Sequence, residues 1–317
     1  MTAPFRGPGV ERLAAVADLV VDPWLDHRPL RLYSADQLAA RVDAEGATVV
    51  VCEGDVVAGP VLDRPLIAVG SARGDPTNVD VAAATAAGVP VLHAPGRNAD
   101  AVAELTVGLL LAVTRQIVAA DRDVRDGEVF RDGTIPYQRF RAWQLAGRTA
   151  GLVGLGAVGR AVRWRLEGLG MRVIAADPYA DDATHGLDDL LAEADVVSVH
   201  AAVTPETVGL IDRAAIERMR DGAVFVNTAR AALHDLDALA EAATVGKLAG
   251  VALDHLEGEE LDPSRPIAKL SNVVLTPHIG GATYDTEANH TAMLADDLVR
   301  LLAGEQPHRI VNPEVLA

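Results

Sequence analysis

Cysteine is almost absent from the sequence: Cys52 is the only one in 317 residues. A single cysteine cannot form a disulfide within the chain, which favours a reducing compartment, so we expect a cytoplasmic protein. Cys52 ends the apolar run Thr48–Cys52 and is therefore interpreted as a core residue of a strand rather than as a reactive thiol. The sequence also shows no signal peptide and no Cys/His spacing typical of zinc sites, so no metal is expected.

Positive charge and long apolar runs are scarce too. The net charge of −17 at pH 7 argues against nucleic acid or an anionic membrane as a partner, although a local group of arginines can still bind a small anion. The most apolar stretch, Leu105–Val113, is too short to span a bilayer. With 50% apolar and 23% charged residues, the chain is typical of a globular protein, and its length suggests two domains.

The most informative stretch is Thr149–Asp177. It begins with an apolar run typical of a buried parallel strand and continues into Gly154, Gly156 and Gly159, a G-x-G-x-x-G motif. A helical spacing and a second apolar run follow, and the stretch ends on Asp177. Such glycines let the backbone turn tightly, approach a pyrophosphate and pack closely on a strand, while the final carboxylate can accept a hydrogen bond from a ribose 2′-hydroxyl. The stretch therefore predicts a dinucleotide site, the alternative being a purely structural turn.

Before this stretch, helical and strand-like patterns alternate, which predicts a parallel sheet covered on both faces. The expected helices are Gly9–Ala17, Ala35–Ala44 and Asp80–Ala87, and the expected strands are Asp18–Asp22, Thr48–Cys52, Leu66–Gly70 and Val89–His93.

A long apolar helix is expected over Asn98–Arg115, buried between domains or against another subunit because it is apolar on all sides. The segment Asp126–Leu145 is expected to be a loop, and it contains Phe130, Tyr137, Phe140 and Trp143. These aromatic residues either anchor a long connection or line a cleft or subunit contact, and the sequence leaves both open.

After the glycine stretch, four more strands are expected, each followed by polar residues. The strands are Val196–Val199, Ala223–Val226, Gly250–Leu253 and Val273–Leu275, and the residues that follow them include His200, Asn227 to Arg230, Asp254 and His278. Ligands bind at the carboxyl ends of the strands of open α/β sheets, so this accumulation predicts the site.

These motifs together resemble the D-2-hydroxyacid dehydrogenase family. The matching pieces are GLVGLGAVGR (151–160), DVVSVHAAVTPETVGLI (195–211), MRDGAVFVNTAR (219–230), GVALDHLEGEE (250–260) and LTPHIGGAT (275–283). The resemblance implies an α/β fold of two flavodoxin-like and Rossmann-like parallel-sheet domains with a cleft between them. A substrate-binding domain would comprise residues 1–97 and 288–317, with the C-terminal helix near Ala288–Leu302 returning to it, and a dinucleotide-binding Rossmann domain would comprise residues 98–287.

The resemblance also implies catalytic roles. His278 matches the family's acid/base histidine, Arg230 the arginine that holds the substrate carboxylate, and Glu259 the carboxylate that pairs with the histidine and favours its protonated form. The alternatives are an ordinary loop histidine, a surface arginine and a surface glutamate. The residues expected to bind the NAD (NADH) cofactor are Gly154, Gly156, Ala157, Val158, Gly159, Asp177, His200, Thr228, Ala229, Asp254 and Gly280.

The chain departs from the family at several places. Ala231 replaces a usual glycine, Glu260 a usual proline, and no first strand is obvious before residues 5–9, so either the first sheet has one strand fewer or this start lies inside a longer chain. In place of a glycine-rich substrate loop, the sequence has Ser71–Thr77, which includes Arg73. The residues expected to contact substrate are Arg73, Gly74, Asn98, Tyr137, Arg139 and Arg230.

We therefore expect an NAD-dependent enzyme that transfers a hydride between the nicotinamide and a small anionic 2-oxo or D-2-hydroxy acid, with a second anionic group such as phosphate or phosphonate. The second anionic group is expected because Arg73 adds a cation to the substrate loop and Arg97 lies at the domain junction. The alternative is that Arg73 pairs with Asp75 and only stiffens the loop. The other readings are an NADPH-using glyoxylate or hydroxypyruvate reductase and a nucleotide-sensing, corepressor-like binding protein. The resemblance further suggests a homodimer formed through the cofactor domain.

Overall fold

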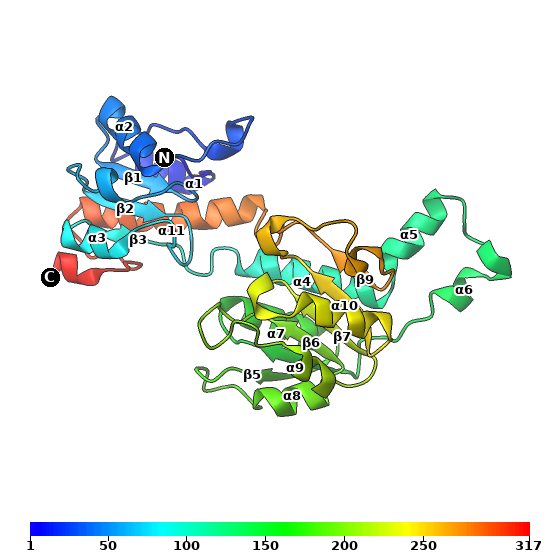
Figure 1. Ribbon diagram of the computed structural model, residues 1–317. Helices are drawn as coiled ribbons and strands as arrows, with labels where there is room; N and C mark the ends of the chain where they lie inside the picture. Colours follow the sequence, from blue (N-terminus) through cyan, green and yellow to red (C-terminus); the bar gives the residue numbers. More distant parts are fainter. The chain divides into compact units, whose positions relative to one another are not determined.

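The computed structural model describes all residues from Met1 to Ala317, and the chain folds into two units. Unit 1 comprises Met1–Asn98 and Thr283–Ala317, and unit 2 comprises Ala99–Ala282 (Figure 1). Each unit is a parallel sheet with helices on both faces, as the sequence predicts.

Unit 1 is built on a three-stranded parallel sheet in the order β1-β2-β3. The strands are β1 (Val49–Cys52), β2 (Ala68–Ser71) and β3 (Val91–Leu92). Alternate side chains point to opposite faces of a strand, so the two faces bury different helices. One face packs against α2 (Ala35–Glu45) and α3 (Val81–Ala86), and the other against α11 (Tyr284–Leu302). The short helix α1 (Pro8–Ala14) packs on α11 (Figure 1).

The strand expected over Asp18–Asp22 is absent, and this prediction was wrong. The backbone of this run is hydrogen-bonded only to Met1: the Met1 amino group donates to the Val20 carbonyl (2.7 Å), and the Asp22 N–H donates to the Met1 carbonyl (2.9 Å). Val20 and Val21 are exposed, and of the apolar residues that suggested a strand only Leu19 packs against the core. Two backbone hydrogen bonds to a single residue are too few to form a β-strand pair.

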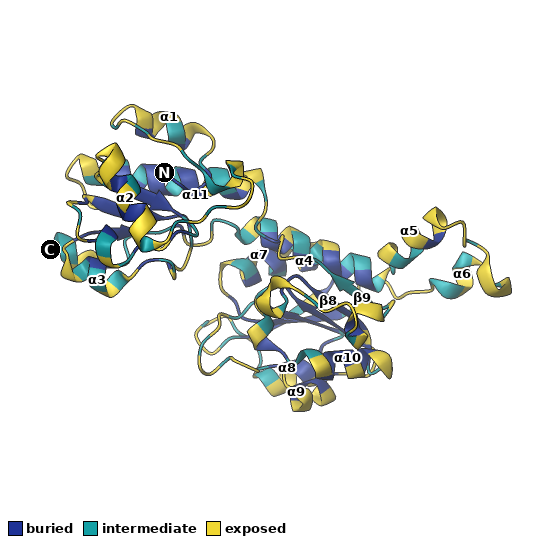
Figure 2. Cartoon of the chain, turned by 45° about the horizontal axis from the view of Figure 1, so that its top comes forward, coloured by how far each residue is buried: buried dark blue, intermediate teal, exposed yellow.

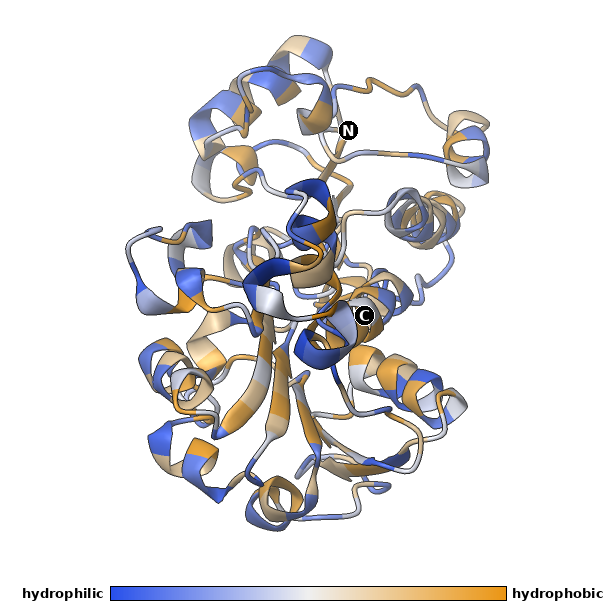
Figure 3. Ribbon diagram, turned by 90° about the vertical axis from the view of Figure 1, so that its right-hand side faces the viewer, coloured by the Kyte–Doolittle hydropathy of each residue, from blue (hydrophilic) through white to orange (hydrophobic).

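Unit 2 is built on a six-stranded sheet in the order β5-β4-β6-β7-β8-β9, with every pair parallel. The strands are β4 (Thr149–Val153), β5 (Arg172–Ala176), β6 (Val196–Val199), β7 (Ala223–Asn227), β8 (Leu248–Leu253) and β9 (Val273–Leu275). The apolar strands run through the lower part of Figure 3, and their burial is visible in Figure 2. All six predicted strands are thus confirmed: each is an apolar run, and the sheet buries the inner strands on both faces, whereas the edge strand β9 is half-buried.

Helices cover both faces of this sheet. One face packs against α8 (Leu187–Glu193), α9 (Arg213–Arg218) and α10 (Leu236–Thr244). The other face packs against α4 (Ala99–Thr114) and α7 (Ala157–Gly168).

The long helix α4 is a core helix of unit 2. Leu109, Leu110 and Val113 are buried against the sheet, and α4 also packs along α7. Much of its apolar surface is thus covered by the sheet and helix of its own unit, and its position between domains or against another subunit stays a prediction. No single helix is long and apolar enough to cross a membrane; only α4 together with α5 (Ile117–Arg125) meets such a length and composition, and the two are bent by 63°.

Residues 115–145, here called the arm, extend from the body of unit 2 (Figures 1 and 2). The segment expected to be a loop contains the short helix α6 (Pro136–Arg139), and α5 precedes it. An ion pair between the buried Asp123 and Arg139 (2.8 Å) holds α5 to α6. Phe130, Tyr137 and Trp143 are 73%, 83% and 77% exposed and do not anchor the arm, whereas Phe140 is half-buried beneath Arg139.

Candidate active site

The glycine turn lies where β4 leads into α7. Gly154 has a φ of +99°, and a Cβ there would lie 2.7 Å from the Ala201 nitrogen. A Cβ on Gly159 would lie 2.1 Å from the Gly154 carbonyl oxygen, so only glycine permits this contact of helix and strand. By contrast, a Cβ on Gly156 would meet nothing within 4 Å. The two outer glycines therefore permit close packing, and the middle one leaves open space beside the start of the helix.

The first turn of α7 presents backbone N–H groups without a side-chain cap. Gly156 occupies the N-cap position and cannot accept from these groups, which include those of Ala157 and Val158. The N-terminus of a helix carries a partial positive charge and binds phosphate groups in this way. The turn therefore fits a pyrophosphate.

Asp177 ends the neighbouring strand β5 and points its carboxylate back at the turn. One carboxylate oxygen accepts from the Leu155 N–H (2.7 Å) and the other from the Tyr179 N–H (2.9 Å). These bonds fix the side chain, and each oxygen keeps further lone pairs for ribose hydroxyls. The nearby cation Arg160 is held by Asp182 through two contacts of 2.6 and 2.8 Å.

His200 follows β6 on the other side of the glycine turn. Burial lowers the pKa of its imidazole to about 4, so the ring is neutral at pH 7. Its Nε2 lies 2.9 Å from Ser198 Oγ, whereas its buried Nδ1 has no hydrogen-bond partner within the chain. A buried polar atom without a partner is costly, so Nδ1 fits a ligand contact. The glycine turn, Asp177 and His200 together fit a dinucleotide.

Asp254 is a buried anchor at the end of β8. Its carboxylate accepts hydrogen bonds from Thr276 Oγ1 (2.6 Å), the Ile279 N–H (2.9 Å) and the Gly280 N–H (2.8 Å). These three donors flank His278, whose backbone adopts a positive φ of +55°. Asp254 thus fixes the loop that carries His278. A Cβ on Gly280 would lie 3.0 Å from this carboxylate, so the loop approaches it closely.

His278 and Glu259 contact each other, as the family resemblance implies. The Nδ1 atom of His278 lies 3.0 Å from Glu259 Oε1, and both side chains are partly exposed. Glu259 also has a positive φ, +62°, a backbone conformation that costs free energy for residues other than glycine. Such outliers cluster at functional sites, where the surrounding structure maintains them.

Arg230 lies at the turn after β7, the strand next to β8. Its guanidinium is exposed and makes no ion pair; its one hydrogen bond within the chain is to the Ala229 carbonyl (2.7 Å). The buried Asn227 fixes the turn by donating to the Arg230 carbonyl (2.9 Å) and accepting from the Ala229 N–H (2.8 Å). Thr228 is also buried and lies 2.8 Å from Thr106 Oγ1. A rigid backbone therefore presents a free cation.

His255 is a residue of this site that the sequence reasoning left unassigned. Its Nε2 lies 3.0 Å from Nε2 of His278, and the two ring centroids are 3.7 Å apart. Atoms of His255, Glu259 and His278 lie within 4.8 Å of one another, a spacing at which metal ions can be bound. Their mutual contacts account for the grouping, and we assign no metal to it. The sequence feature that could have identified His255 is its position directly after Asp254, at the edge of the sheet where the other site residues lie.

The expected substrate residues of unit 1 lie near the end of β2 and before α4. Arg73 donates to the Glu53 carbonyl (2.7 Å) and to Thr77 Oγ1 (2.9 Å). It makes no ion pair with Asp75, so that alternative was wrong. Gly74 is exposed and its carbonyl lies 2.7 Å from His93 Nδ1, while Asn98 is the last residue of this part of unit 1.

Of three other groups expected near substrate, the two arginines already have partners within the chain. Arg97 forms an ion pair with Glu53 and lies 2.7 Å from His290 Nδ1, so its charge is compensated within unit 1. Arg139 is bound to Asp123 in the arm of unit 2, and Tyr137 is exposed beside it.

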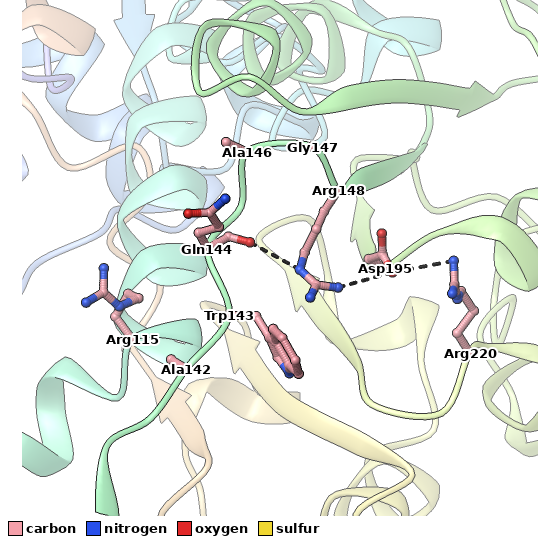
Figure 4. Close-up of a pocket in the computed structure, with 9 residues that line it drawn as sticks. All are labelled: Arg115, Ala142, Trp143, Gln144, Ala146, Gly147, Arg148, Asp195 and Arg220. Carbon is pink, nitrogen blue, oxygen red and sulfur yellow. Dashed lines mark hydrogen bonds and ion pairs between the residues drawn. The ribbon is translucent and has the colours of Figure 1, made fainter. Parts of the chain in front are cut away.

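A hollow of about 790 Å³ lies elsewhere on unit 2. Trp143 of the arm and three arginines, Arg115, Arg148 and Arg220, line it (Figure 4). The carboxylate of Asp195 lies 3.5 Å from the guanidinium groups of both Arg148 and Arg220. Arg148 and Asp195 immediately precede β4 and β6, so this hollow is at the amino ends of the strands. It is therefore separate from the residues at the carboxyl ends.

Known proteins resemble the chain over this region and beyond it. Residues 107–280 match the model of the D-isomer specific 2-hydroxyacid dehydrogenase, NAD binding domain. The chain is 40% identical over 243 residues to a D-3-phosphoglycerate dehydrogenase of Archaeoglobus fulgidus, an alignment that covers 74% of this chain and 45% of that protein. It is 36% identical to a glyoxylate reductase of Thermofilum pendens, with 98% and 92% covered. The chain thus spans less than half the length of the first relative and most of the second.

A solved structure is similar to the chain over nearly its whole length. The D-isomer specific 2-hydroxyacid dehydrogenase of Lactobacillus delbrueckii ssp. bulgaricus, in its NAD complexed form, superposes with a TM-score of 0.79. The two chains are 25% identical, and 96% of each is covered.

Proposed function

The chain belongs to the family of D-isomer specific 2-hydroxyacid dehydrogenases, and we propose that it reduces a small 2-oxo acid to the D-2-hydroxy acid with NADH, or catalyses the reverse reaction. The observation that carries this proposal is the pair of His278 and Glu259, 3.0 Å apart, in the same unit as the glycine turn and the unpaired Arg230.

Each residue has a distinct part in the proposed reaction. NADH supplies the hydride when bound. Arg230 binds the substrate carboxylate with a planar pair of N–H donors and stabilises negative charge that develops on the carbonyl oxygen. His278 donates its Nε2 proton to that oxygen, and Glu259 stabilises the protonated imidazole through Nδ1. In the reverse direction, neutral His278 accepts the hydroxyl proton.

Two other functions remain as candidates. The similarity to a glyoxylate reductase favours glyoxylate as a substrate, and reduction of glyoxylate or hydroxypyruvate with NADPH is the alternative within this family. A corepressor-like protein that only senses nucleotide would bind NADH without turnover. Oxidation of NADH with a panel of 2-oxo acids separates these possibilities. A cytoplasmic location stays a prediction from the single cysteine.

The acid/base role of His278 predicts a large loss of turnover on its removal. We expect His278→Ala to lower kcat by about 10²–10⁴-fold, the usual contribution of general acid–base catalysis. NADH affinity, measured by fluorescence titration, should change little. Near-parental turnover by the variant would contradict the assignment.

The carboxylate of Asp177 predicts a preference for NADH over NADPH. It can accept from a ribose 2′-hydroxyl but repels a 2′-phosphate, and the cation at Arg160 is neutralised by Asp182. We expect kcat/KM to be clearly higher with NADH, and Asp177→Ala to narrow the difference. Equal or better activity of the unmodified enzyme with NADPH would refute this reading.

The cation at Arg73 predicts a substrate with a second anionic group. A charge-assisted hydrogen bond contributes roughly 1.5–3 kcal/mol, so Arg73→Ala should raise KM for a dianion such as D-3-phosphoglycerate by about 10–150-fold. KM values for glyoxylate and pyruvate should be nearly unchanged. Tyr137 and Arg139 stay predicted contacts of the substrate. The idea fails if the unmodified enzyme prefers monoanions, or if both substrate types lose equally.

The exposed apolar surface of the arm predicts a homodimer formed through unit 2. Phe130 and Tyr137 are 73% and 83% exposed, and burial against a second copy would remove this surface from water. We expect the protein to have a dimer mass by light scattering and Phe130→Asp to weaken the dimer. The matched control is Val245→Asp, at a 79% exposed position outside the arm. A monomeric mass for the unmodified protein would contradict the proposal.

A further inference from the structure

The hollow at the amino ends of the strands carries a charge opposite to that of the whole chain. The chain has 45 acidic and 28 basic residues, yet three arginines and one carboxylate line the hollow: Arg115, Arg148, Arg220 and Asp195. The arginines come from separate segments, since Arg115 follows α4, Arg148 precedes β4 and Arg220 lies shortly before β7. Three segments therefore bring cations together in a protein whose net charge repels anions.

Asp195 compensates only part of this charge. Its Oδ1 atom lies 3.5 Å from Nη1 of both Arg148 and Arg220, which is longer than a normal hydrogen bond. Its Oδ2 atom accepts a hydrogen bond from the Thr149 N–H (2.9 Å) instead. Arg115 is exposed and forms no ion pair within the chain. One carboxylate thus faces three guanidinium groups, which leaves a surplus of two positive charges.

The backbone that carries these groups is fixed by hydrogen bonds. Asp195 links three strands, because its N–H donates to the Thr149 carbonyl (2.9 Å) and its carbonyl accepts from the Val224 N–H (3.0 Å). The turn before β4 is closed by the Arg148 N–H, which donates to the carbonyl of the buried Leu145 (3.0 Å). The backbone of Asp195 and Arg148 is therefore ordered before an anion binds, which lowers the entropic cost of binding.

Trp143 and Arg148 form the central part of the hollow (Figure 4). The Arg148 guanidinium lies 5.0 Å from the centroid of the Trp143 ring, and its Nε donates to the Gln144 carbonyl (3.1 Å). Arg115 and Arg220 lie on opposite sides of this pair in the same view. Cations are therefore present along the length of the hollow rather than at one point.

The size and chemistry of the hollow favour one class of ligand. Its volume of about 790 Å³ lies within the range of roughly 300–1,000 Å³ typical of small-molecule sites. Arginine binds phosphate oxygens through two parallel N–H groups and stays charged at physiological pH. We propose that this hollow binds a polyphosphate chain, with Arg148 and Arg220 at one end and Arg115 at the other. If the chain belongs to a nucleotide, its base stacks on the exposed ring of Trp143.

Calorimetric titration with inorganic tripolyphosphate tests this site in the protein saturated with NADH, so that the glycine turn is occupied. We expect saturable binding, and we expect Arg115→Gln, Arg148→Gln and Arg220→Gln each to weaken it about tenfold or more, the effect of losing a charge-assisted hydrogen bond. The matched control is Arg213→Gln, which removes the same charge from an exposed ion pair with Glu241 outside the hollow. The control should bind tripolyphosphate as the unmodified protein does.

Asp195→Asn tests the charge of the hollow in the opposite direction. The asparagine oxygen can still accept the Thr149 N–H, while the one negative charge that faces the arginines is lost. We expect the affinity for tripolyphosphate to rise about three- to tenfold. A variant that only disturbed the local fold would lose affinity, so the sign of the change separates charge from structure.

Titration with ATP identifies the source of the phosphate groups. Tighter binding of ATP than of tripolyphosphate, with the difference lost in Trp143→Leu, supports a nucleotide as the ligand. Equal affinities support an inorganic polyphosphate.

Three results would overturn the inference. The first is no saturable binding by the unmodified protein, as expected if a second copy of the chain covers the hollow. The second is an equal loss of affinity in Arg213→Gln, because binding would then follow net charge alone. The third is a lower affinity in Asp195→Asn. None of them bears on the proposed hydride transfer, because His278 and Arg230 follow the carboxyl ends of their strands, away from the hollow.

Discussion

The site in unit 2 depends on one buried carboxylate, that of Asp254. Burying a charge is costly unless it is hydrogen-bonded, and here three donors from the loop 276–280 meet it. A hydrogen bond to a charged group contributes about 1.5–3 kcal/mol, whereas a residue in the left-handed region costs roughly 1–2 kcal/mol. The three bonds therefore outweigh the positive φ of His278 that they enclose. The same carboxylate thus satisfies its own charge and fixes the orientation of His278.

Asn227 has the corresponding role on the neighbouring strand. It is fully buried, and its amide bonds with the Ala229 N–H, the Arg230 carbonyl and His234 hold the turn that presents Arg230. The two anchors are directly connected, because the Asp254 N–H donates to the Asn227 carbonyl (3.0 Å). Parallel pairing of β7 and β8 therefore places the turn of Arg230 and the anchor of the His278 loop at one edge. The relative positions of these groups follow from strand register and two polar side chains.

Much of this arrangement could be predicted from the sequence, for identifiable reasons. The six strands of unit 2 are apolar runs, most of them buried on both faces, so composition indicated them, and the polar residue after each run indicated the edge. Asp18–Asp22 shows the limit, because Val20 and Val21 have the same composition but are exposed. The arm shows a second limit of prediction from the sequence. It is held together by the ion pair between Asp123 and Arg139, and no local sequence pattern indicates that these two residues contact each other. The contact of His255 with His278 was missed because it joins two different loops, whereas the amide of Asn227 bonds only to residues of its own turn, whose geometry the sequence does not reveal.

The histidines at this edge show why local sequence cannot assign their chemistry. Burial lowers the pKa values of His200, His234 and His255 to about 4, so all three are neutral hydrogen-bonding groups at pH 7. His278 differs in being partly exposed and in direct contact with Glu259, the arrangement that suits a group which must gain and lose a proton. Beside the fixed carboxylate of Asp254, the charged groups here are Arg230, Glu259 and, when protonated, His278, whereas the other histidines at this edge are neutral. Proton transfer can then change the charge of one residue while its neighbours only accept or donate hydrogen bonds, which keeps the positions of the reacting groups the same in both protonation states.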